Sequence, residues 1–190
     1  MLYFMLKFAH LSGILLVAAG LFAALFQDFL YRRSTVRSSQ TMSLKLMLDW
    51  YTFFALPGAA IVFASGGALV AVYYGPLDLL NTPWLAGMFG LFTIGLVRGI
   101  TVSGPYLRGL IAMTEADSQA SGPETLPGRH LPVFVRGLEV PFLFLIVALG
   151  VFRPETWTMV LVGIGLALQF TFALTLLLPS ITARSDDCLQ

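Results

Sequence analysis

The sequence predicts an all-α protein that crosses a membrane several times, and three observations lead to this prediction. Of the 190 residues, 57% are hydrophobic and only 11% are charged, whereas a soluble domain carries about 25% charged residues. The mean hydropathy is +0.84. Five stretches are apolar enough for membrane helices, which need roughly 20 such residues each. We therefore expect a polytopic transmembrane helical bundle in a single domain, with the lipid bilayer as its main partner.

The five expected spans differ in how clearly they are delimited. The third is expected to continue as helix past Tyr106. The fourth is interrupted by Arg136, Glu139 and Pro141, so four spans, with this half-helix lying at the interface, are the alternative. Because residues 143–152 alone are too short to cross, the full crossing is preferred. The expected spans are residues 2–30, 50–74, 84–102, 132–152 and 157–178.

The first apolar stretch is interpreted as an uncleaved membrane span. Residues 11–26 exceed the hydrophobic region of a signal peptide, which is about 7–15 residues long. Lys7 is the only early positive charge, and no small-x-small cleavage site precedes the charged residues 28–33. Further along, residues 117–129 combine serine, glycine, proline and acids and form the one clear loop.

The distribution of lysine and arginine predicts the orientation. The loops after the first and third spans and the C-terminal tail are basic, whereas the loops after the second and fourth spans carry few positive charges. We therefore expect the C-terminus in the cytoplasm and the N-terminus outside, in a bacterial-type inner membrane. The basic residues are Arg32, Arg33, Arg37, Lys45, Arg108, Arg129 and Arg184. Interfacial aromatics agree, with Trp84, Trp157, Tyr73 and Tyr74 at the outer edge and Trp50 and Tyr51 at the inner.

Small residues indicate where the helices pack, since lipid provides no hydrophobic drive between them. Each of four spans carries glycines at helical spacing, which predicts close helix contacts or, alternatively, room for a flat cofactor. Pro57 predicts a kink in the second span and Pro141 another in the fourth. The small residues are Gly13, Gly20, Gly58, Ser65, Gly66, Gly67, Gly95, Gly99, Gly163 and Gly165.

His10 is the main candidate site residue, because an ionisable group inside a membrane is a functional candidate by default. It lies on the first span, about 13 Å below the outer end at 1.5 Å per residue. Neutral imidazole binds iron, copper or zinc. Lys7 lies one turn nearer the outer surface on the same face. This arrangement suits haem b, with His10 on the metal and Lys7 reaching a propionate. The alternative is a histidine hydrogen-bonded to a neighbouring helix.

A second ligand is harder to assign. His130, the only other histidine, belongs to the third loop, and its height differs from that of His10 by roughly half the ~30 Å core. These two side chains cannot ligate one iron atom. Three possibilities remain for the second ligand. The haem is five-coordinate, a partner chain provides the ligand, or Met88 on the third span provides it.

Other polar residues at membrane depth suggest pairings between or within helices. Arg98 and Glu139 lie at similar depth near the cytoplasmic side, which predicts a structural ion pair or, alternatively, a proton or substrate site. Asp28 and Arg32, four residues apart, form an interfacial pair. Three residues of the fifth span are expected to bond across helices, namely Gln169, Thr171 and Thr175. No phosphate-binding loop, nucleophile–base pair or metal cluster is present in the sequence, and nothing indicates nucleic acid.

Several motifs together resemble a known family. They are Leu6-Lys7-Phe8-Ala9-His10-x-x-Gly13, Phe54-Ala55-Leu56-Pro57-Gly58, Ser65-Gly66-Gly67-Ala68-Leu69, Thr82-Pro83-Trp84-Leu85 and Val151-Phe152-Arg153-Pro154. They resemble the predicted integral membrane proteins called domain of unknown function 2269, over about residues 1–154.

That family looks related to the copper-resistance D membrane proteins and the HemJ-type protoporphyrinogen oxidases, which carry a Lys-x-x-His start on the first helix. In HemJ-type proteins this histidine is associated with haem. The resemblance therefore implies a haem or metal site at His10 with Lys7 beside it, and Arg98 is a loose match to a basic residue on a later helix.

Three functions follow as hypotheses. The first is a haem-b-binding or redox-associated membrane protein that uses His10. The second is a non-catalytic accessory or structural subunit of a larger membrane complex or homo-oligomer. The third is a small metal or proton transporter that uses His10, Arg98 and Glu139. The residues do not decide between an enzyme and a protein without catalysis.

Overall fold

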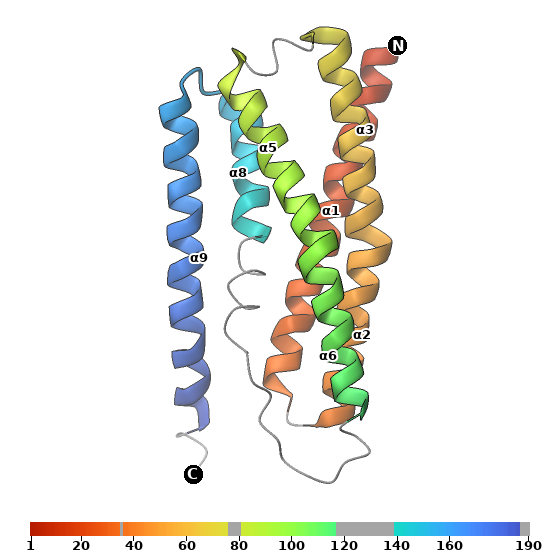
Figure 1. Ribbon diagram of the computed structural model, residues 1–190, viewed down its shortest axis with the longest axis vertical. Helices are drawn as coiled ribbons and strands as arrows, with labels where there is room; N and C mark the ends of the chain where they lie inside the picture. The colour runs from red at the N-terminus through yellow and green to blue at the C-terminus, as the bar shows by residue number, and fades with distance from the viewer. Residues whose placement is uncertain (35, 76–80, 117–138, 187–190) are drawn as a thin grey trace. The chain divides into compact units, whose positions relative to one another are not determined.

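The computed structural model describes residues 1–34, 36–75, 81–116 and 139–186, and the regular structure in this part of the chain is helical throughout (Figure 1). Three helical runs are long and apolar enough to cross a membrane: Leu2–Arg33, Ser38–Tyr73 and Pro83–Glu115. Two shorter apolar helices cover Glu139–Phe152 and Trp157–Ala173. The predicted all-α membrane class is confirmed. That the chain crosses the membrane five times stays a prediction. The described part of the fourth helix has only 14 residues, fewer than the roughly 20 that a crossing needs.

Three sequence predictions fall outside the described residues. They concern the loop at residues 117–129, His130, and the first half of the expected fourth span with Arg136. The side chains of α9 beyond Ala173, including Thr175, also lie outside. Pro141 stands two residues after the first described residue of α8, so the bend predicted there falls at the edge of the description.

The first helix, α1, runs from Leu2 to Arg33, as the apolar pattern predicts. Near its end the Arg32 Nε lies 2.7 Å from an Asp28 carboxylate oxygen, which confirms the predicted pair. Large apolar side chains such as those of Phe4, Phe8 and Phe26 stand exposed on its outer face. Soluble proteins rarely expose so much contiguous apolar surface, so these faces fit lipid contact.

The second span is longer than the sequence indicates. The expected loop ends early, because α2 (Arg37–Trp50) begins shortly after α1 and continues through η1 (Tyr51–Ala55) into α3 (Leu56–Tyr73). The prediction that Lys45 lies in a loop is therefore wrong. Serine, threonine and charged residues lower the hydropathy of this segment, but its Leu44 and Met47 are buried and stabilise it as helix.

A π-helical turn precedes a proline in each of the two later long runs. In η1 the Leu56 N–H donates to the Tyr51 carbonyl, and in η2 (Gly99–Ser103) the Gly104 N–H donates to the Gly99 carbonyl. Pro57 and Pro105 each follow two residues after the end of a π turn. Because proline lacks an N–H, the carbonyl four residues earlier loses its α-helical donor. A π turn is the local irregularity that such a helix adopts.

The third run comprises α5 (Pro83–Arg98), η2 and α6 (Gly104–Ala116). Its length confirms that helix continues past Tyr106. The described residues form two compact units whose boundary falls within α5: one contains those up to 81 together with 96–116, and the other contains 82–95 together with 139–186.

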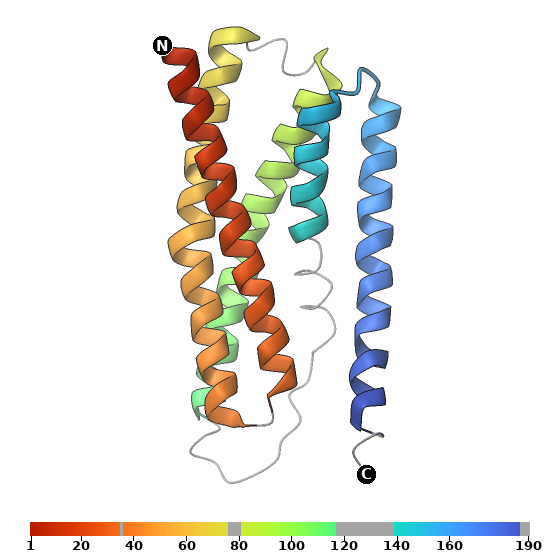
Figure 2. The ribbon, with the colours of Figure 1, turned by 180° about the vertical axis from the view of Figure 1, so that it is seen from behind.

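The first unit pairs α1 with the run from α2 to α3, and the two lie side by side in views from opposite directions (Figures 1 and 2). At the end of the unit near the α1–α2 connection, α6 joins them. Leu44, Met47 and Leu107 form a buried cluster there. On the surface beside this cluster, the Lys45 ammonium lies 2.7 Å from a Glu115 carboxylate oxygen, which ties α2 to α6.

The second unit packs the first part of α5 with α8 (Glu139–Phe152) and α9 (Trp157–Asp186). Figures 1 and 2 show α8 and α9 side by side. Leu91, Leu149 and Val160, one from each helix, form the buried cluster of this unit. The Arg153 guanidinium lies 5.4 Å from the centre of the Trp84 ring, so the end of α8 contacts the start of α5.

Candidate functional site

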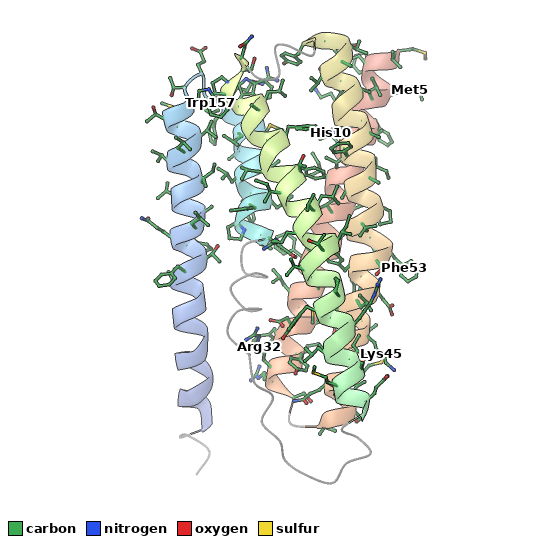
Figure 3. All side chains as sticks on the ribbon, viewed as in Figure 1. Met5, His10, Arg32, Lys45, Phe53 and Trp157 are labelled. Carbon is green, nitrogen blue, oxygen red and sulfur yellow. The ribbon has the colours of Figure 1, made fainter. Side chains whose placement is uncertain are left out.

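The candidate site is built around His10, which α1 presents to α3 in the first unit (Figure 3). The imidazole Nδ1 lies 3.2 Å from the Ser65 hydroxyl oxygen, a contact between residues 55 positions apart. The ring is half-buried. His10 thus contacts a neighbouring helix through one edge of its ring. This agrees with the alternative prediction that His10 forms a hydrogen bond to another helix.

The direction of this hydrogen bond follows from the serine. The Ser65 Oγ lies 2.5 Å from the Ile61 carbonyl oxygen and 3.4 Å from that of Val62. A hydroxyl has one proton, and carbonyls only accept. Ser65 therefore donates to its own helix, as serine commonly does, and accepts from His10. In the neutral ring the proton lies on Nδ1, and Nε2 carries the lone pair that a metal or a donor would use.

A glycine admits the ring against α3. A Cβ built on Gly66 would lie 3.0 Å from the His10 Cε1 and 3.3 Å from Nδ1. These separations are tighter than nine in ten real Cβ contacts, so a larger residue would require the imidazole to shift by a few tenths of an ångström. The next residue differs, since a Cβ on Gly67 would meet no described atom within 4 Å. Of these two glycines, Gly66 is therefore the one that lies against the ring.

The close approach of α1 and α3 fixes the height of this contact. A Cβ on Gly13 would lie 2.8 Å from a Val62 methyl group, and one on Gly20 would lie 2.6 Å from the Ala55 nitrogen. A Cβ on Gly58 would lie 2.8 Å from the Val17 nitrogen. The two backbones can approach this closely only with glycine at these positions. The packing role predicted for these three glycines is confirmed.

These contacts share one antiparallel register. Seven residues backward along α1, from Gly20 to Gly13, correspond to seven residues forward along the opposing helix, from Ala55 to Val62. The same step leads from the Val17–Gly58 contact to the His10–Ser65 contact. The sequence predicts Ser65 only as a small packing residue, not as the partner of His10. The seven-residue spacing of the glycines is the signal that could have identified it.

Lys7 lies one turn before His10, toward the N-terminal end of α1, as the helical spacing predicts. Its ammonium group lies 5.7 Å from the centre of the Tyr3 ring. Tyr3 in turn meets Tyr73, the last residue of α3, edge to face with ring centres 5.0 Å apart. Lys7 is exposed and its charged end is directed toward the helix terminus, where a polar group of a ligand could reach it.

Met88 has a different setting. It packs in the second unit beside Leu91, Leu149 and Val160. Its Sδ and Cε would each lie 3.4 Å from a Cβ on Gly150. Because His10 belongs to the first unit and Met88 to the second, the role of Met88 as a second axial ligand stays a prediction.

Arg98 and Glu139 are likewise divided between the two units, so their predicted ion pair stays a prediction. Arg98 ends α5 and immediately precedes the π turn η2, whereas Glu139 is the first described residue of α8. Within the described residues, no three His, Cys, Asp or Glu side chains gather in a group that could hold a metal ion.

A comparison with known proteins identifies one family. The family model described as "Predicted integral membrane protein (DUF2269)" matches residues 4–154. This range contains His10, Ser65 and the glycine contacts between α1 and α3, and it ends before α9 begins. No curated protein and no solved structure matches the chain. With most of its length matched and its long apolar helices, the chain belongs to this family of integral membrane proteins.

Proposed function

We propose that this protein binds haem b within the membrane, with His10 as an axial ligand of the iron through Nε2. The observation that carries the proposal is the hydrogen bond from Nδ1 to Ser65, whose own proton goes to Ile61. Histidine ligands of metals and haems commonly donate their other ring N–H to a fixed acceptor, which sets the tautomer and the ring orientation. The Ser65 oxygen has this role here.

The surroundings of His10 fit such a group. Gly66 leaves room for the imidazole against the backbone of α3, so the ring can keep the orientation in which Nδ1 meets Ser65. Lys7 provides a cation one turn nearer the end of the helix, where a propionate would pair with it. Haem bound here would supply one-electron redox chemistry. The chain's own residues orient the imidazole and hold its proton on Nδ1.

The remaining parts of the proposal come from the sequence. We propose five spans with the N-terminus outside and the C-terminus in the cytoplasm of an inner membrane. His10 then lies in the outer half of the bilayer. The resemblance to HemJ-type and copper-resistance D membrane proteins supports a histidine-bound group at this position. Met88 or a residue of a second chain is the proposed sixth ligand.

An absorption spectrum of the detergent-purified protein from haem-replete cells tests the proposal. We expect a Soret band that disappears in His10→Ala and persists in the matched histidine control His130→Ala. Ser65→Ala should reduce haem retention by about ten- to a hundred-fold, because loss of a supporting hydrogen bond typically weakens metal sites by this range. A colourless and metal-free wild-type preparation would overturn the proposal.

The second candidate is a non-catalytic subunit of a membrane complex. It is favoured by the observation that the His10–Ser65 contact continues the register of the glycine contacts between α1 and α3, so packing alone gives His10 a role. Under this alternative, His10→Ala lowers the unfolding midpoint of the colourless protein, and the protein co-purifies with other subunits. A bound haem that requires His10 would exclude it.

A further inference from the structure

The glutamine of α9 has no place in the packing of its own unit. Gln169 is exposed, and its amide makes no hydrogen bond to another described side chain. It lies twelve residues beyond Trp157, the first residue of the helix, which is about 18 Å at 1.5 Å per residue. Since the hydrocarbon core is about 30 Å thick, this amide lies deep in the membrane.

The packed face of α9 points the other way. Val160 and Thr171 are 1% and 0% exposed, and Ala167 is also buried. Val160 precedes Gln169 by nine residues, which at 3.6 residues per turn is two and a half turns. Gln169 is therefore on the side of α9 opposite to the face that contacts α8. The Thr171 hydroxyl, in contrast, donates to the Ala167 carbonyl at 2.8 Å and needs no further acceptor.

An amide that faces lipid alone is costly, because no water is available to bond its two N–H donors and its carbonyl. A glutamine at this depth is consequently expected to face another protein surface. The residues one turn before and after it are small. A Cβ built on Gly165 would meet no described atom within 4 Å, and Ala173 is exposed, so another helix can approach Gln169 closely.

We propose that this face of α9 binds the same face of a second copy of the chain, with the two Gln169 amides hydrogen-bonded to each other. A carboxamide is self-complementary, since each carries both N–H donors and a carbonyl acceptor. Two copies inserted in the same membrane orientation have parallel α9 helices, so a twofold axis along the membrane normal brings Gln169 to the same depth in both. The family match ends at residue 154, so α9 adds this surface outside the matched region.

Disulfide cross-linking in native membranes tests the interface, with the chain's single cysteine removed as Cys188→Ser. Val162→Cys is the reporter, because Val162 lies seven residues before Gln169 on the same face and is 56% exposed. Leu161→Cys is the matched control, at the same depth and 63% exposed but about 100° around the helix. We expect an oxidised species of twice the 20.7 kDa chain mass for Val162→Cys and little for Leu161→Cys.

The glutamine is tested in the Val162→Cys background. Gln169→Leu should reduce the cross-linked dimer roughly three- to ten-fold at a fixed protein-to-lipid ratio, which is the range for interhelical amide bonds in membranes. Gln169→Asn, which keeps the amide, should retain most of it. Equal cross-linking of Val162→Cys and Leu161→Cys, an unchanged dimer in Gln169→Leu, or cross-links only to a different protein would overturn the proposal.

Discussion

The hydroxyl of Tyr51 occupies the space beside Gly99 that any larger residue would require: a Cβ built on Gly99 would overlap it. Tyr51 is the first residue of the π turn η1, and Gly99 is the first residue of η2. The two irregular turns of the first unit therefore meet, each six residues before a proline. This contact therefore constrains how the two helical runs pack against each other at their π turns.

Replacement of Gly99 by alanine should destabilise the protein by about 1–3 kcal/mol, the usual cost of overpacking. Thermal unfolding in detergent micelles measures the change. Gly109→Ala, at a helical glycine with no described atom within 4 Å, is the control and should be neutral or slightly stabilising. Tyr51→Phe should rescue most of the loss in Gly99→Ala, since it removes the overlapping oxygen. An unfolding midpoint of Gly99→Ala equal to that of Gly109→Ala would contradict the contact.

Two adjacent glycines should respond differently beside His10. Gly66→Ala places a methyl group 3.0 Å from the His10 Cε1, so the ring must move and weaken its bond to Ser65, at a cost of about 1 kcal/mol. Gly67→Ala meets no described atom within 4 Å and should cost nothing. The thermal unfolding midpoint should be lower for Gly66→Ala than for Gly67→Ala. Gly66→Ala should also retain less haem than Gly67→Ala. A larger effect of Gly67→Ala would show that the ring does not lie against Gly66.

Arg153 combines a strained backbone with a favourable contact. Its φ of 46° is in the left-handed region, which disfavours non-glycine residues by about 1–2 kcal/mol. Its guanidinium lies 5.4 Å from the centre of the Trp84 ring, a cation–π contact that contributes about 0.5–1 kcal/mol at an exposed site. Arg153→Ala loses the contact and keeps the strain, whereas Arg153→Gly loses both.

Arg153→Gly should therefore be more stable than Arg153→Ala by about 1 kcal/mol. Chemical unfolding of both variants measures the difference. Trp84→Leu is the control: in that background, Arg153→Ala should cause no further loss. If alanine and glycine at position 153 gave equal stability, the left-handed backbone would not persist in solution.

The ion pair between Lys45 and Glu115 should contribute little to stability. The nitrogen–oxygen distance is 2.7 Å, but both side chains are about half exposed, so water and salt screen the attraction. A double-mutant cycle with Lys45→Met and Glu115→Gln should give a coupling below about 1 kcal/mol that vanishes in high salt. A coupling of several kcal/mol that persists in high salt would mean that the pair is shielded by lipid or by another chain.

The predicted pair between Arg98 and Glu139 is tested by charge reversal. Arg98→Glu or Glu139→Arg alone should strongly reduce the yield of folded protein, because each leaves like charges together at membrane depth. The double variant should restore most of the yield, as measured by size-exclusion chromatography in detergent. If the double variant were no better than the single variants, these two residues would not be partners.

Hydropathy, which depends on each segment alone, determined much of this protein. The helical class, the long helix of residues 2–30, the continuation past Tyr106 and the local pair of Asp28 and Arg32 all follow from residues near one another in sequence. Hydropathy wrongly placed Lys45 in a loop, because polar residues lower the local hydropathy of α2. Burial of Leu44 and Met47 against other helices stabilises this segment as a helix.

Only the tertiary structure decided which residues meet. The sequence identified His10 and the glycines separately, but the contact of His10 with Ser65 depends on the axial register of α1 against α3. The Thr82–Leu85 and Arg153–Pro154 motifs looked like independent landmarks, yet Arg153 lies over Trp84. Register and rotation of a helix arise from the sum of its contacts along the whole interface. No single segment encodes them, so they become visible only when the helices are packed together.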